Sequence, residues 1–346
     1  MQPGSHVERH RRCARAATRI AGTVALAVVL GVALAAGAVV VLATTAHAAG
    51  PEATWAPPTG LAWASRLASY LGLTMVVGVL ATMAFVWRLA VGWWVLHRLA
   101  VAGAVVMALG AVVQVGILAG ERAGRPLWSA LASLVEVTRT DRGAALAARA
   151  VVAVGLTGLL RLARRDLRRA WKSLALFVAA LLATWAFAGH AWSQRWPIAG
   201  VMLDVVHHGA AAAWLGSAVV VGLAALRGAA AGQEHVLTER FSRLSSLTVI
   251  VVIATGVAQT VRLTPSPGDL TADHGRLLLV KVAVTAVALA VGYAAQRRIR
   301  TWRRAMDAPE PAAIRPLRRL LLAEVALGTV VLGVTAMLVI QPIGPR

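Results

Sequence analysis

Residues 202–216 read MLDVVHHGAAAAWLG, an apolar stretch of helical length that carries one carboxylate and two imidazoles. At about 100° per residue, Asp204, His207 and His208 fall within one arc of roughly 100° on a helix. Trp214 lies near the His207 side of that arc. A charge at the centre of a membrane helix costs about 2.5 to 3.5 kcal/mol, so ionisable residues there face the bundle interior and usually mark a site. We expect these side chains to point together into a helix bundle.

The composition of the whole chain indicates a polytopic membrane protein. Its 346 residues are 59% hydrophobic and 14% charged, with a mean hydropathy of +0.72. Apolar runs long enough to span a bilayer recur from end to end, which predicts an all-α membrane bundle of nine helices. The predicted spans are approximately residues 20–45, 61–87, 95–119, 144–160, 173–190, 198–226, 244–262, 276–296 and 317–340.

The net charge of +21 reflects membrane topology rather than nucleic-acid binding. With the N-terminus inside, the predicted inner segments hold 24 of the 35 Lys and Arg residues. This bias obeys the positive-inside rule, so we predict a multi-pass protein of the cytoplasmic membrane whose basic residues contact lipid and no nucleic acid. A single cysteine, Cys13, excludes a disulfide framework, and the absence of a GxxxxGK[ST] motif argues against a nucleotide motor.

Three parts follow along the chain. Residues 1–45 form a basic leader and a first apolar run, which precedes an A-x-A site at residues 46–48. That run is longer than the 7 to 15 apolar residues usual in a signal peptide, so we favour a retained helix; cleavage would leave eight spans. Residues 46–197 hold the N-terminal helices and an outer loop, 120–143, which we interpret as a short helix lying on the bilayer. Residues 198–346 form a second membrane domain.

Further polar residues fall near the predicted outer face. His190 ends the span 173–190, and the turn through Pro197 makes this span an antiparallel neighbour of the next, so His190 can face His207. At 1.5 Å per residue, Lys281 lies about 8 Å and Asp204 about 9 Å below that face, and we expect the two charges to pair. Glu324 lies in the inner half.

The same residues have the chemistry of metal ligands. His190, His207 and His208 offer imidazole nitrogens and Asp204 a carboxylate, a set that suits copper, zinc, iron or nickel. Among soft ligands, only Met202 is well placed. From the residues alone, two readings stay open: a metal or haem site in the outer half, and a polar network that fixes helix packing.

The chain resembles the copper-resistance D (CopD) family of bacterial membrane proteins over roughly residues 185 to 300. The motifs that carry this resemblance are Gly189-His190-Ala191, Asp204 with His207, Trp214 and Gly216, Gly256, and the GRLLLVK run of residues 275–281. The resemblance implies copper handling in the cytoplasmic membrane, with copper moved inward and received from a separate extracytoplasmic CopC-like protein. The positions carried over are His190, Asp204, His207, Trp214 and Lys281.

The sequence departs from the family pattern at three positions. His274 stands where the family usually has tyrosine, Gln296 stands where asparagine is common, and His208 is additional. The first and third of these departures would add imidazole to the outer site.

We therefore expect a transporter rather than an enzyme. Copper, as Cu(I) or Cu(II), would bind His190, His207 and His208, with Asp204 as a ligand or as the group that orients a histidine. The residues expected around them are Lys281, Trp214, His274 and Met202. Two alternatives remain: a b-type haem redox protein with His190 and His207 as axial ligands, and a structural membrane subunit.

Overall fold

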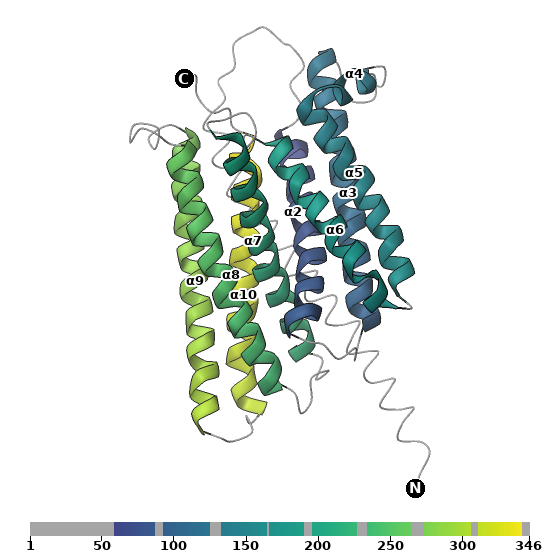
Figure 1. Ribbon diagram of the computed structural model, residues 1–346. Coiled ribbons are helices and arrows are strands. Elements are labelled where there is room, and N and C mark those ends of the chain that lie inside the picture. Colours follow the sequence, from purple (N-terminus) through teal and green to yellow (C-terminus); the bar gives the residue numbers. More distant parts are fainter. Residues whose placement is uncertain are drawn as a thin grey trace.

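Long helices that run side by side make up almost all of the described chain (Figure 1). The computed structural model describes residues 59–86, 93–124, 133–164, 166–189, 196–226, 234–263, 273–305 and 311–340. The helices are α2 (Thr59–Ala81, extended by the π-helix η1, Thr82–Val86), α3 (Trp93–Ala123), α4 (Leu134–Thr138), α5 (Asp141–Ala163), α6 (Leu167–Ala188), α7 (Pro197–Leu226), α8 (Glu234–Leu263), α9 (Asp273–Ala305) and α10 (Pro311–Leu338).

The predicted fold class is confirmed. In the described ranges, eight helices are long and apolar enough to cross a membrane, and no strand occurs. They coincide with eight of the nine predicted spans; the run 20–45 lies outside the described residues, as do Cys13 and His190.

Both ends of the predicted outer loop, residues 120–143, belong to the neighbouring long helices. The helix α3 continues to Ala123, and α5 begins at Asp141 behind an N-cap in which the Thr140 hydroxyl accepts from Gly143 N at 3.2 Å. Between them, the described helical part is only α4, whose Val137 is buried against α3 and α5. The structure therefore places α4 as a cap on these two helices. We refer to this end of the bundle as the α4 end; it is the end that the sequence predicts to be outside.

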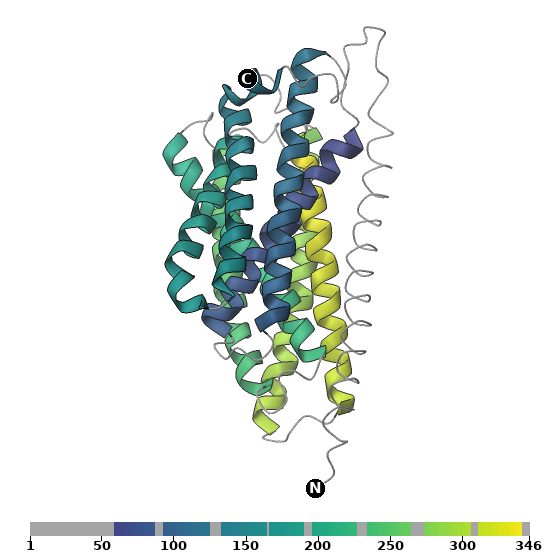
Figure 2. The ribbon, with the colours of Figure 1, turned by 90° about the vertical axis from the view of Figure 1, so that its right-hand side faces the viewer.

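The helices α2 and α7 occupy the middle of the bundle. The helices α3, α5 and α6 lie on one side of this pair, and α8, α9 and α10 lie on the other (Figures 1 and 2). Buried apolar side chains from both groups meet along α2, which is the most enclosed of the spanning helices, whereas α9 is the least. Side chains that point into the space between these two groups of helices are therefore enclosed by protein and contact one another.

Small residues bring the two central helices into direct backbone contact. A Cβ atom added to Gly216 of α7 would overlap the carbonyl oxygen of Thr74 on α2, and one added to Gly78 would overlap the backbone of Gly216. Glycine at such crossings lets membrane helices pack closely. A cross-helix hydrogen bond from Trp63 Nε1 to the carbonyl oxygen of Gly333, 2.9 Å long, ties α2 to α10 as well.

Candidate functional site

The polar turn of α7 lines a cavity of about 650 Å³ at the α4 end of the bundle. Asp204, His207 and His208 all contribute to its wall, together with residues from α2, α5, α6, α8, α9 and α10. The helical spacing of these three residues therefore brings them to one side of α7. Most of the remaining wall is apolar, and the cavity extends inward as far as Thr74 and Leu289.

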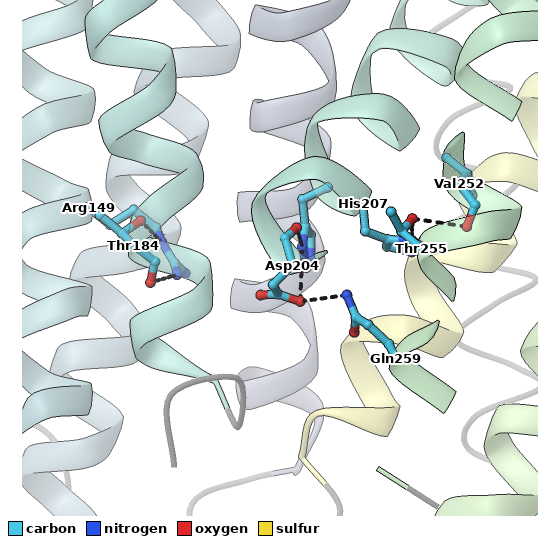
Figure 3. Close-up of polar contacts among 8 residues, drawn as sticks. Arg149, Thr184, Asp204, His207, Val252, Thr255 and Gln259 are labelled. Carbon is cyan, nitrogen blue, oxygen red and sulfur yellow. Dashed lines mark hydrogen bonds and ion pairs between the residues drawn. The ribbon is translucent and has the colours of Figure 1, made fainter. Parts of the chain in front are cut away.

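His207 is oriented by α8. Its Nδ1 lies 3.0 Å from the hydroxyl oxygen of Thr255 (Figure 3), and that hydroxyl donates to the carbonyl oxygen of Val251 at 2.6 Å. Because the threonine proton is directed to the carbonyl, the hydroxyl oxygen accepts from His207 Nδ1. We therefore assign the Nδ1–H tautomer to the ring, which leaves the lone pair on Nε2. This is the arrangement of a histidine that binds a metal through Nε2.

His208, like His207, donates through Nδ1, but its environment is different. Its Nδ1 donates to the carbonyl oxygen of Asp204 at 2.9 Å and lies 3.5 Å from Oδ1 of that carboxylate. The ring stacks on Tyr70, with centroids 5.7 Å apart and planes 3° from parallel, and Trp185 lies at 6.3 Å. The rings of His207 and His208 meet edge to face at 5.9 Å. Both imidazoles thus turn Nδ1 toward protein acceptors.

The predicted direct pair between Asp204 and Lys281 is wrong. Within the described part of the chain, Asp204 is instead contacted by Gln259, whose Nε2 donates to Oδ1 at 3.3 Å, and by His208 (Figure 3). Lys281 lines the same cavity and interacts with the carboxylate electrostatically without an ion pair. Both charges line one cavity, but α8 places the Gln259 amide beside the acid.

Trp214 joins α7 to α10 at the deeper end of the cavity. Its Nε1 donates to Oε1 of Glu324 at 2.8 Å, and both residues are buried. Gly292 of α9 makes room for this carboxylate, because a Cβ there would lie 3.1 Å from Glu324 Oε1. The indole N–H of Trp214 is therefore engaged by Glu324, away from the imidazoles.

The other predicted site residues fall into different places. His274 lines the cavity, and its Nδ1 is buried without a hydrogen-bond partner. Met202 is 59% exposed and does not line the cavity. Gln296 donates to the Ser246 hydroxyl at 3.2 Å, on the α8 and α9 side of the bundle. His190 lies outside the described residues.

Three residues of the site were not predicted from the sequence: Thr255 and Gln259, which position other side chains, and the buried Arg149. Thr255 and Gln259 bring α8 to the polar turn, and a threonine and a glutamine four residues apart at one end of a span were the signal for them. Arg149 is buried, donates to Thr184 Oγ1 and O at 3.0 and 2.9 Å, and lies 3.7 Å over the Trp185 ring. Its signal was an arginine inside an apolar run.

The described residues alone do not complete a metal centre. In these ranges, no three or more His, Cys, Asp or Glu side chains form a group that could hold a metal ion. What is present is a pair of imidazoles with a carboxylate nearby, in a cavity with buried basic residues.

The fold and this lining define a polytopic all-α membrane protein with ionisable side chains inside the bundle. Residues 235–338 match the family model CopD, described as copper resistance protein D, which confirms the predicted resemblance. Helices α8, α9 and α10 make up the part of the chain that is similar to this copper-resistance family. No curated protein and no solved structure matches the chain.

The match includes some of the motif residues and not others. Gly256 and the run 275–281 lie within it, whereas His190, Asp204 and His207 precede it. Gly256 packs against His207: a Cβ at this position would lie 3.5 Å from Cε1 of the ring. Helix α8, which lies in the matched region, therefore provides the wall against which the His207 imidazole is held.

Proposed function

We propose that this protein transports copper inward across the cytoplasmic membrane and is not an enzyme. Copper, as Cu(I) or Cu(II), is the cargo, and it is received at the α4 end, which we take to face outward with the N-terminus inside. A separate extracytoplasmic CopC-like protein delivers it. The CopD match supports copper as the cargo, and the basic residues at the opposite end of the bundle support the orientation.

The observation that carries the proposal is the hydrogen bond between His207 Nδ1 and Thr255. It leaves Nε2 as the metal-binding nitrogen of a side chain that lines the cavity. His208, 5.9 Å away between ring centroids, offers a second Nε2. We assign His190 as a further ligand, because it precedes the turn into α7 in the sequence.

Asp204 acts on the site through its charge. The carboxylate is held by Gln259 and His208, and it offsets part of the positive charge that copper brings into a region of low dielectric constant. Lys281 and His274 lie in the same wall and tune this balance, while Trp214 fixes the distance between α7 and α10 through Glu324.

The experiment is metal analysis of protein purified from copper-supplemented cells, combined with copper accumulation in those cells. We expect bound copper in the wild type, and loss of both signals in His207→Ala and in His190→Ala with membrane insertion intact. His97→Gln is the matched control, because His97 does not line the cavity and its Nε2 bonds to the Leu160 carbonyl at 2.9 Å.

The same samples separate the alternatives. A Soret band with one haem per chain would assign His190 and His207 as axial ligands of a b-type haem instead. Unchanged copper content in both histidine variants would contradict the proposal, and a wild type that binds no metal would leave a structural membrane subunit.

A further inference from the structure

Basic side chains dominate the charge of the cavity. Among the described residues that line it, one is acidic, Asp204, and five are basic: Arg66, Arg142, Arg149, Arg262 and Lys281. Glu121 interacts electrostatically with Arg66, but it does not line the cavity. Transport of a cation alone does not account for this excess of positive charge.

The arginines belong to one group. Arg66 of α2 interacts electrostatically with both Arg142 and Arg149 of α5, so three guanidinium groups from two helices share the α4 end of the cavity. Like charges repel strongly where the dielectric constant is low, and side chains that can reach water normally separate. Their convergence indicates a ligand of opposite charge.

Arg149 is held rigidly in this group. Two of its N–H groups donate to Thr184 (Figure 3), and the guanidinium lies 3.7 Å over the ring of Trp185. An arginine has five N–H donors, so Arg149 keeps others for a ligand while its plane is fixed by α6. A guanidinium fixed in this way is pre-organised to bind an oxyanion.

Arg66 has an unused donor. Its Nη1 is buried and has no hydrogen-bond partner. Buried donors in proteins are nearly always paired, and an arginine fork matches the two oxygens of a carboxylate or a phosphate. The unsatisfied nitrogen and the neighbouring Arg149 therefore point to one oxyanion between α2 and α5.

One side of the cavity wall is formed by apolar residues that are exposed on the outside of the bundle. The helices α8 and α9 make little contact with each other, and Val257, Val261 and Val282 line the cavity while remaining well exposed. An apolar side opening beside a basic end suits an anionic lipid, whose head group would reach the arginines. A small dissolved anion would bind the same guanidinium groups.

We propose that the α4 end of the cavity is an oxyanion site in which Arg66 and Arg149 bind a carboxylate or phosphate group. The site does not depend on copper transport, since none of its residues is assigned as a copper ligand. The group belongs either to a dissolved anion or to the head group of an anionic lipid.

The first test uses inorganic phosphate and citrate, titrated by calorimetry into the full chain in a neutral detergent. Saturable binding is expected, with an affinity at least tenfold lower in Arg66→Gln. Arg66→Lys, which retains charge without the fork, should fall between the two. Arg122→Gln is the matched control, because Arg122 is exposed in the last turn of α3, at the α4 end of the bundle, and does not line the cavity. This variant should bind the anions as the wild type does.

The second test distinguishes the source of the oxyanion. The protein is placed in nanodiscs of phosphatidylcholine with or without phosphatidylglycerol, released, and examined by native mass spectrometry. Retained phosphatidylglycerol in the wild type but not in Arg66→Gln assigns a lipid head group, whereas phosphate or citrate binding without retained lipid assigns a dissolved anion. If none of these ligands binds, or if Arg66→Gln binds as the wild type does while eluting as a folded species, the proposal is overturned.

Discussion

The hydroxyl of Thr255 controls which nitrogen of His207 is available. It donates to the carbonyl of Val251 and so accepts from Nδ1, which leaves the lone pair on Nε2. Without this acceptor, the imidazole would be free to take the other tautomer or to rotate. Metal affinity at such a histidine depends on the group behind it nearly as much as on the ligand itself.

Thr255→Val should therefore weaken copper binding without removing a ligand. Loss of the hydrogen bond behind a ligating histidine typically costs 10 to 100-fold in metal affinity. Competition with a chromogenic copper chelator measures the change. Thr248→Val is the control, since the Thr248 hydroxyl also lies on α8 but bonds only to backbone carbonyls of Leu244 and Ser245. Equal affinities in the two variants would count against a tuning role for Thr255.

For single residues, the sequence predicts which side chains lie together on one helix better than it predicts contacts between side chains of two helices. The period of the helix alone brings Asp204, His207 and His208 to the same cavity wall. The partner of Asp204 depends on the rotation and height of α8 relative to α7, which hydropathy does not encode. Two charges at equal depth suggested Lys281, but α8 presents Gln259 to the carboxylate.

Among the elements, α2 and α7 cross with their backbones in direct contact. Their crossing depends on Gly78 and Gly216, where the backbones leave no room for a side chain. Since α7 carries the imidazoles and α2 carries Arg66 and Tyr70, this crossing also fixes the distance between the two walls of the cavity.

Gly216→Ala should destabilise the bundle, because the added methyl group would overlap the Thr74 carbonyl and force α2 and α7 apart. Overpacking of this kind costs about 1 to 3 kcal/mol. Gly222→Ala is the control on the same helix: no atom lies within 4 Å of a Cβ there, and alanine favours helix, so stability should hold or rise. Unfolding of the two variants in detergent measures their stability. Equal unfolding midpoints would contradict close backbone packing at Gly216.

Hydropathy locates the helices but not their ends. It predicts spans of 95–119 and 276–296, whereas α3 runs to Ala123 and α9 to Ala305. The apolar run records only the part of a helix inside the hydrocarbon, about 20 residues, and a helix with charged residues continues past it into water. The polar final turns of α9 form such a continuation beyond the hydrocarbon.

For the molecule as a whole, the alternating direction of the helices places a group of exposed arginines at the end opposite α4. The helix α5 leaves the α4 end and finishes beside Arg161 and Arg164, and α9 finishes at the same opposite end with Arg297 and Arg298. From the positive-inside rule, we expect that basic end to face the cytoplasm.

Thr138→Cys and Thr301→Cys, each in a Cys13→Ser background, test this orientation. Both threonines are exposed and bond only to a nearby carbonyl, one at the α4 end and one at the basic end of α9. A membrane-impermeant maleimide should label Thr138→Cys in intact spheroplasts and Thr301→Cys only after permeabilisation. The reverse pattern would invert the topology and the direction of uptake.

The closeness of the Trp185 ring to the stacked rings of Tyr70 and His208 has an optical consequence. Cu(II) quenches indole emission over short distances, and Trp185 lies 6.3 Å from His208 between ring centroids. The chain has 12 tryptophans, so the signal of this one is the difference between the wild type and Trp185→Phe. The cavity thus contains its own fluorophore, and the copper binding that we propose for the imidazole pair can be tested in real time without an attached dye.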